Sequence, residues 1–303
     1  MSDVRKGLIW IAAFVLVVLA GDRLFAWLAQ RVLVRSQFRY SRLYRGGNDA
    51  EIVILGDSRG VNSFYAPAIE KLTGRRAFNL SYNSLSPEIA EALLLDHLDR
   101  NAKPKIVILE FTSAIVSGEV LTELRPYAGL SPRLMALYTR KHPYAARAGR
   151  VFHLLPLNSG FYIEALHYMR RDDQDWIMRS ALPPEARTAP AAIWRFKPFP
   201  QNIAALGRIA DALRRRGIEG RFVIAPYYQK HFMNMPQFLG LVEHAVDPDE
   251  HVRIYNYADA IDDPGAFADT VHLNETGSLI LLKMLQRDGV FAAGGMAGPG
   301  ARF

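Results

Sequence analysis

The sequence predicts an α/β protein in which helices cover both faces of a parallel sheet of about five strands, behind an apolar N-terminal helix. From Glu51 onward, short apolar runs alternate with helical stretches, and the runs are continuous instead of alternating with polar residues. Continuous runs are typical of strands buried on both faces of a parallel sheet, and alternation of strand with helix implies right-handed crossovers. The expected strands are Ile52–Leu55, Ala77–Leu80, Lys105–Glu110, Arg221–Pro226 and Val252–Tyr255. The expected helices are Ala66–Leu72, Pro87–Asn101, Gln201–Arg216, Met235–His244 and Thr276–Gln286.

The composition allows one large core and restricts the chemistry. With 303 residues, half of them apolar and 22% charged, the chain has room for one large α/β domain plus an appendage. It has no cysteine, which excludes disulfides, a thiolate nucleophile and cysteine metal ligands. The net charge of +7 fits nucleic acid or an anionic membrane surface. Because the basic residues crowd around the N-terminal apolar stretch and none of their runs is interleaved with aromatics, we expect a membrane partner and no nucleic acid.

The N-terminal segment has the length and composition of a membrane span. Leu8–Gly21 carries no charge, and apolar residues resume after Asp22 and Arg23 as far as Leu28. A helix of about 21 residues reaches about 31 Å, which is enough for a bilayer core. The segment is either a signal peptide, cut after small residues near Ala20, or an uncleaved anchor. The apolar stripe continues past the cut, which favours the anchor and requires the two charges to pair or to snorkel to the membrane surface.

The stretch from 117 to 200 interrupts the alternation of strands and helices. It is rich in proline and aromatic residues, and we expect a helical and irregular insertion over the strand ends, where substrate-binding loops of such sheets lie. Its aromatic side chains either stack on a sugar or form the core of the insertion. The expected organisation is therefore an anchor over 1–35 and one domain over 36–303, with this insertion at about 117–200.

The first motif with chemical content follows the first expected strand. Ile52–Leu55 leads directly into Gly56-Asp57-Ser58-Arg59-Gly60, which delivers a serine to the carboxyl edge of the sheet, where open α/β sheets bind ligands. Small residues allow the backbone to turn sharply, and the amides of the following helix would stabilise negative charge near Ser58. The alternative is that Ser58 only caps this helix, with Asp57 bonding loop amides.

The second motif lies just before the last expected helix, and its first residue, Asp269, comes 211 residues after Ser58. Asp269 precedes His272 by three residues, so its carboxylate can accept a hydrogen bond from one imidazole nitrogen and leave the other free to take a proton from a serine. Asn274 suits the cap of the final helix. The same Asp and His pair could also hold a metal or make only a surface hydrogen bond, but the other histidines form no cluster at metal-ligand spacing, and we expect no metal and no cofactor.

Together the two motifs resemble those of the SGNH or GDSL hydrolase superfamily. The resemblance covers about residues 50–116 and 220–290 and is closest to its membrane-anchored cell-envelope branch, similar to proteins of alginate O-acetylation and of D-alanyl transfer. It implies a flavodoxin-like three-layer αβα sandwich and ester chemistry, with Ser58 as nucleophile, His272 as base and Asp269 as its partner. It also implies a periplasmic or extracytoplasmic domain on a single-pass inner-membrane anchor.

The middle motifs of that family are altered. Where a glycine amide and an asparagine side chain normally donate to the oxyanion, the chain has Asn83 and Ser84 after the second strand and Thr112 and Ser113 after the third. At the second strand a backbone amide of Asn83 or Ser84 can still replace the glycine amide. In place of the asparagine, either Thr112, Ser113 or Asn83 donates, or the activity is slow or specialised. We expect Arg59 to contact an acidic substrate, to be exposed to solvent or to pair with a carboxylate.

Two functions follow from these motifs. One is a serine esterase or O-acyltransferase acting on acetyl or other acyl esters of an envelope glycan or of a lipid-linked substrate. The other is a non-catalytic envelope protein that binds glycan or partners a multi-pass O-acyltransferase.

Overall fold

The structure is a computed structural model that describes residues 3–292 of the chain. Contacts between residues divide it into two units. The first comprises Met1–Arg45 and Leu121–Asp172, and the second Gly46–Val120 and Asp173–Phe303. The domain boundaries drawn from the sequence, 1–35 and 36–303, stay predictions.

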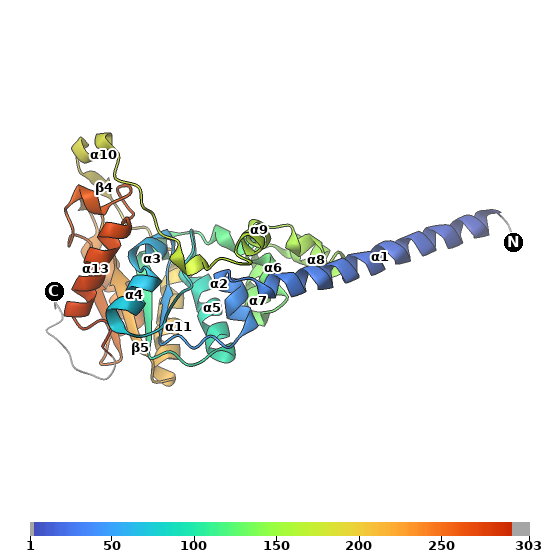
Figure 1. The fold of residues 1–303 in the computed structure, drawn as a ribbon, viewed down its shortest axis with the longest axis horizontal. Coiled ribbons are helices and arrows are strands. Elements are labelled where there is room, and N and C mark those ends of the chain that lie inside the picture. The colour runs from blue at the N-terminus through green and yellow to red at the C-terminus, as the bar shows by residue number, and fades with distance from the viewer. Residues whose placement is uncertain (1–2, 293–303) are drawn as a thin grey trace. The chain divides into compact units, whose positions relative to one another are not determined.

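The second unit contains the predicted parallel sheet (Figure 1). Its five strands lie in the order β2-β1-β3-β5-β7, and every neighbouring pair is parallel. The strands are β1 (Ile52–Leu55), β2 (Ala77–Asn79), β3 (Ile106–Glu110), β5 (Glu219–Ile224) and β7 (Val252–Asn256). The order places β1 in the interior of the sheet, paired with β2 on one side and β3 on the other, as in flavodoxin-like sheets.

Helices cover the sheet and complete the core. They are α3 (Ser58–Ser63), α4 (Ala66–Thr73), α5 (Pro87–Arg100), α11 (Pro200–Arg215), α12 (Met235–Val246) and α13 (Glu275–Arg287). All residues of β1 and β3 are buried, which explains why both strands appear in the sequence as unbroken apolar runs. One core cluster joins alternate β1 and β3 residues to α4 and α13, for example through Ile54, Ile69 and Leu281.

The predicted fold class is confirmed, and the differences lie in short elements. α3 was expected only as the start of a helix after the serine turn. A second, two-stranded parallel sheet, β4 (Ala192–Trp194) with β6 (Lys230–Phe232), was not expected at all. A short helix, α10 (Pro184–Thr188), precedes it. β4 and β6 have three residues each and are largely exposed, so neither forms the buried apolar run by which β2 and the other strands of the large sheet are recognised.

The first unit is helical and contains the N-terminal segment. Its long helix α1 runs without interruption from Asp3 to Arg35, and by length and composition it suits either a membrane span or a signal sequence. The other helices are α2 (Arg39–Arg45), α6 (Arg125–Ala128), α7 (Pro132–Lys141), α8 (Pro143–Val151) and α9 (Gly160–His167), with a 3-10 turn η3 (Leu155–Leu157). Aromatic side chains form its core: Phe38 and Tyr40 pack edge to face, and both contact Phe161.

Helices α11 and α12 pack closely at a glycine, which gives a test of the fold. A Cβ atom added to Gly207 would lie 2.6 Å from the carbonyl oxygen of Ala245, whereas one added to Gly240 would meet nothing within 4 Å. We expect Gly207→Ala to lower the free energy of unfolding by about 1–3 kcal/mol, because backbone must move to admit the methyl group. Gly240→Ala, the matched control, should leave stability unchanged or raise it by up to about 1 kcal/mol. Thermal melts of the two variants check this, and equal melting temperatures would contradict the described packing.

Candidate active site

Ser58 stands at the junction of β1 and α3. β1 ends at Leu55 and α3 begins at Ser58, with the Asp57 side chain capping the helix by accepting a hydrogen bond from the Arg59 amide. The turn passes very close to β3: a Cβ atom on Gly56 would lie 2.8 Å from the Cβ of Glu110. Because Ser58 is the first helical residue, its own amide has no acceptor within the helix and can donate to a ligand.

His272 and Asp269 meet Ser58 from the other end of the chain. The Ser58 Oγ lies 2.7 Å from the His272 Nε2, and the His272 Nδ1 lies 2.8 Å from an Asp269 carboxylate oxygen. The second Asp269 oxygen accepts hydrogen bonds from the backbone amides of Val271 and His272. With Nδ1 protonated toward the carboxylate, Nε2 is left as the acceptor for the serine hydroxyl.

Asp269 is suited to stay ionised in this arrangement. Partial burial raises the pKa of its carboxyl, but the hydrogen bond from the His272 ring and those from the Val271 and His272 amides together hold that pKa below its ordinary value. The neighbouring loop is secured by Asn274, whose side chain caps α13 by accepting from the Gly277 amide, as predicted. The Asn274 amide group also donates to the carbonyls of Gly265 and Phe267.

Arg59 does not face a substrate-binding space. Its side chain is buried and its Nε lies 3.4 Å from Glu110, so of the three expected roles the structure shows the pairing with a carboxylate, and the solvent-exposed role is wrong. The guanidinium donates to the carbonyls of Val271 in the histidine loop and of Ala225 and Pro226 after β5. It also lies flat against Tyr227, with its carbon 3.5 Å from the ring centre.

One guanidinium therefore balances two buried carboxyl groups. Burial raises the pKa of Asp57, and it raises the pKa of Glu110 to about 7, with the Asp57 charge adding to the shift and the Arg59 charge opposing it. Removing Arg59 would leave both acids without their cation in the interior of the sheet edge, where isolated charge is unfavourable. The arginine after the serine thus links β1, β3, β5 and the loop that holds His272.

The four expected oxyanion donors divide into two groups. Asn83 and Ser84 are exposed and form the centre of a turn closed by a hydrogen bond from the Leu85 amide to the Tyr82 carbonyl, a bond that uses neither of their own amides. Ser84 has a φ of 59°, in the left-handed region that favours glycine.

Thr112 and Ser113 do not fit the expected role. Both belong to a 3-10 turn after β3, η1 (Phe111–Ile115), and both are buried. The Thr112 hydroxyl donates to the Glu110 carboxylate, and the Ser113 hydroxyl donates to the Glu110 carbonyl. Since a hydroxyl has one proton to donate, neither remains available for an oxyanion.

Two buried asparagines were missed in the sequence. The Asn62 side chain donates to the Ser58 carbonyl and accepts from the Met178 amide. Asn79, the last residue of β2, donates to the carbonyls of Gly60 and Phe64 and accepts from the Ser81 amide. Both hold α3 in place beneath Ser58, and no motif or period distinguishes them from surface asparagines in the sequence.

The arrangement of hydroxyl, imidazole and carboxylate is that of an activated nucleophile. The imidazole can take the serine proton as the oxygen attacks an electrophilic carbon, and the carboxylate orients the ring and stabilises its charged form. Within residues 3–292, no three His, Asp or Glu side chains are grouped so that they could hold a metal ion.

Comparisons with known proteins give no family assignment. No protein-family model and no curated protein matches the chain. Among solved structures it is similar to a Streptococcus pneumonia protein named as a platelet activating factor, with 11% identity and a TM-score of 0.41 over 93% of this chain and 98% of that one. It is also similar to an acetyl xylan esterase from the rumen bacterium Butyrivibrio proteoclasticus, with 9% identity and a TM-score of 0.33 over 79% and 64% of the two chains. Likeness of this extent carries no argument about the site, whose chemistry rests on its geometry.

The contacts of Arg59 predict that it positions the histidine loop. In Arg59→Lys the charge that balances Glu110 remains, but the planar fork that reaches Val271, Ala225 and Pro226 is lost. We expect Ser58 to react with a fluorophosphonate at least about tenfold more slowly, because small displacements of a base from its nucleophile have effects of that order. Labelling rates of the detergent-solubilised full-length protein measure this.

The matched control is Arg208→Lys, since Arg208 pairs with a carboxylate too, in its case with both oxygens of Glu91 and on the exposed surface of α11. It should label at the wild-type rate. A folded Arg59→Lys protein that labels as fast as wild type would show that the guanidinium does not hold His272 in position.

Proposed function

We propose that the chain is a membrane-anchored serine esterase or O-acyltransferase that acts on acyl esters, foremost acetyl esters, of a cell-envelope glycan. The observation that carries this proposal is the 2.7 Å contact between the Ser58 Oγ and the His272 Nε2, backed by the Asp269 carboxylate. The side chains lie at the carboxyl edge of a parallel sheet, the usual ligand-binding edge of this architecture.

In the proposed mechanism the Ser58 oxygen attacks the ester carbonyl carbon while His272 takes the hydroxyl proton. The tetrahedral oxyanion accepts hydrogen bonds from the backbone amides of Ser58 and Ser84. His272 then gives the proton to the leaving alcohol, the C–O bond to that alcohol breaks, and an acyl-serine remains. Water or a sugar hydroxyl, deprotonated in turn by His272, attacks the acyl-serine and restores the enzyme. Water as acceptor makes an esterase, and a sugar hydroxyl makes a transferase.

The membrane part of the proposal rests on the continuity of α1. Its apolar stretch is exposed, while Ala26 and Leu33 farther along the same helix are buried in the first unit. The Asp22 carboxylate accepts hydrogen bonds from the backbone amides of His153 and Leu154. A helix that is both apolar at one end and part of a folded core at the other favours an anchor over a cleaved signal peptide. We further propose that the second unit faces the extracytoplasmic side, where envelope glycans are.

A second candidate is a non-catalytic protein that binds glycan or partners a multi-pass O-acyltransferase. The observation in its favour is that two of the three side chains expected to replace the missing asparagine donor, Thr112 and Ser113, donate their hydroxyl protons to Glu110. The loss of one oxyanion donor costs about 2.7–4 kcal/mol of transition-state stabilisation, which permits either slow turnover or none.

Covalent labelling separates the two candidates. We expect the full-length protein in detergent to react with a fluorophosphonate and to hydrolyse p-nitrophenyl acetate, because Ser58 is activated by His272. Ser58→Ala should abolish labelling and hydrolysis, and Ser117→Ala, a change at an exposed serine outside the site, should alter neither. No labelling of a folded wild-type protein would favour the non-catalytic candidate.

The role of the carboxylate can be tested separately. Asp269→Asn should lower kcat for p-nitrophenyl acetate by a factor on the order of 10³–10⁴ with little change in KM, because the amide favours the wrong imidazole tautomer. Initial rates over a range of substrate concentrations measure both constants. If kcat of this variant stays within about twofold of wild type, Asp269 is not the partner of the catalytic base.

A further inference from the structure

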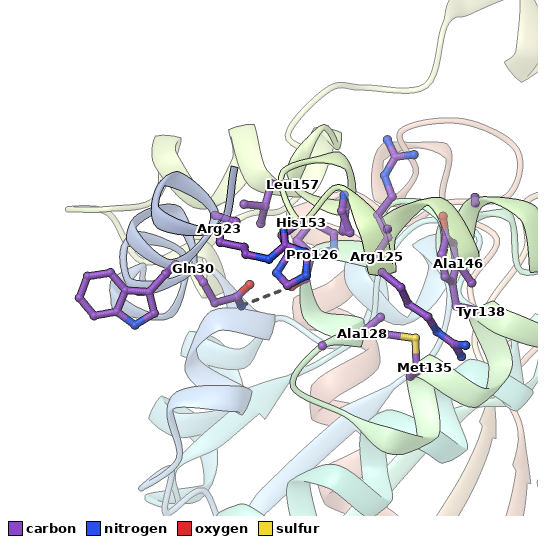
Figure 2. A pocket seen from close by; sticks show the side chains of 17 residues that line it. Arg23, Gln30, Arg125, Pro126, Ala128, Met135, Tyr138, Ala146, His153 and Leu157 are labelled. Atoms are coloured by element: carbon purple, nitrogen blue, oxygen red, sulfur yellow. Dashed lines mark hydrogen bonds between the residues drawn. The ribbon is translucent and has the colours of Figure 1, made fainter. Parts of the chain in front are cut away.

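The first unit contains a cavity of about 390 Å³ beside α1 (Figure 2). From α1 it is lined by Arg23, Ala26, Trp27 and Gln30, and its remaining walls come from α6 to α8 and the turn around η3. Gln30 closes one side by donating a hydrogen bond to the Pro126 carbonyl. The volume is within the range of small-molecule sites, which is roughly 300–1,000 Å³. Nothing in the proposed ester chemistry uses this cavity.

The cavity lies at the end of the apolar stretch of α1. Arg23 directly follows the uncharged residues Leu8–Gly21 and Asp22, and Trp27 comes one turn later. Tryptophan at such a place marks the interface between hydrocarbon and water, where lipid headgroups are. The backbone amides of His153 and Leu154 donate hydrogen bonds to the Asp22 carboxylate, which ties the η3 region to this end of the apolar stretch.

The η3 region carries apolar side chains suited to the interface between membrane and water. Phe152 is 51% exposed and Leu154 and Leu155 are about 40% exposed, and Leu24 and Phe25 of α1 are exposed as well. Exposed apolar residues gathered beside a membrane span are covered most favourably by the bilayer itself. His153 and Pro156, which line the cavity, belong to the same short segment as these exposed side chains.

The lining combines an apolar floor with cationic side chains. Figure 2 shows Arg23 and His153 on one side and Arg125 and Met135 on the other, around Pro126 and Ala128. Among the described residues that line the cavity none is acidic. Arg23 lies 3.9 Å from Asp22 and is partly balanced by it, which leaves the charges of Arg125 and Arg150.

Arg125 has unused donor capacity. One of its terminal nitrogens donates to the Asn158 carbonyl, but its Nε is buried and has no hydrogen-bond partner within the described part of the chain. A buried N–H without an acceptor is costly, so the Arg125 guanidinium lacks part of its hydrogen bonding within the described chain while its side chain lines the cavity. Guanidinium groups bind phosphate with two parallel hydrogen bonds, and the exposed Arg150 at the rim adds a second cation.

We propose that this cavity binds the phosphate-bearing headgroup of an anionic phospholipid from the membrane in which α1 is anchored. Arg125 and Arg150 hold the phosphate, and the acyl chains leave along the apolar surface of Phe152, Leu154 and Leu155. The site rests on the proposed membrane anchoring and not on the chemistry at Ser58. A soluble phosphate ester would satisfy the same arginines, but it would leave the apolar edge of the cavity uncovered.

Lipid binding to the full-length protein in detergent tests the proposal. Native mass spectrometry during titration with phosphatidylglycerol should show binding at least about tenfold tighter than with phosphatidylcholine. Arg125→Gln/Arg150→Gln should remove that preference. The matched control Arg147→Gln/Arg171→Gln removes the same charge from exposed positions of the same unit outside the cavity and should keep the preference.

Each other outcome contradicts a defined part of the proposal. Equal binding of the two lipids, or wild-type preference in the cavity variant, would overturn the headgroup site. The single variant Arg150→Gln separates loss of binding from misfolding, because it changes only an exposed side chain. It should weaken phosphatidylglycerol binding by about threefold or more. Competition by free glycerol 3-phosphate as strong as that of the lipid would assign the site to a soluble phosphate ester instead.

The readout is independent of ester hydrolysis, so an inactive protein that still prefers phosphatidylglycerol would overturn the proposed chemistry and not the lipid site. Release of the wild-type protein from membranes by alkaline carbonate would overturn the anchoring on which the lipid site rests.

Discussion

The buried pair of Arg59 and Glu110 is the interaction on which the site depends. Parallel strands end at the same edge of the sheet. This brings β1 and the histidine loop into the same region, but it does not by itself place Ser58 against His272. The Arg59 guanidinium joins them, since it is carried by the residue after Ser58 and donates to the Val271 carbonyl, 212 residues away. It also contacts Glu110 at the end of β3 and carbonyls after β5, so three neighbouring strands and the loop share one cation. The Ser58 and His272 contact is the functional product of this arrangement.

The buried Glu110 of this pair explains why the residues after β3 do not take the role expected from the sequence. Glu110 must be surrounded by donors because it is fully buried, and Thr112 and the Ala225 amide are among those donors. The side chains after β3 therefore serve the interior of the sheet edge instead of the oxyanion. In the proposed ester chemistry, backbone amides at the N-terminus of α3 and in the exposed turn at Ser84 would stabilise the oxyanion instead.

Much of the fold and the grouping of Ser58, His272 and Asp269 could be predicted because their signals are local. Unbroken apolar runs mark β1 and β3, and Ser58, Asp269 and His272 belong to short motifs at strand-to-helix junctions. Pairing with a carboxylate was one of the alternatives for Arg59, but the sequence could not decide among them. The bonds of Thr112 and Ser113 to Glu110 could not be predicted, because burial of these side chains depends on strands far apart in sequence. Asn62 and Asn79 act through single buried amides that leave no periodic pattern. The cavity of the first unit is formed by α1 together with residues 121–172, and no motif in either segment indicates that they pack together.

The central claim is that Ser58 forms a covalent acyl intermediate with the help of His272. Its most direct test is the mass of the peptide that contains Ser58 after the full-length protein is mixed with p-nitrophenyl acetate and quenched in acid. The account predicts an added acetyl group on Ser58 in the wild-type protein and none in His272→Ala. An unmodified peptide in a wild-type protein that turns over the ester, or acetylation at another residue, would contradict it.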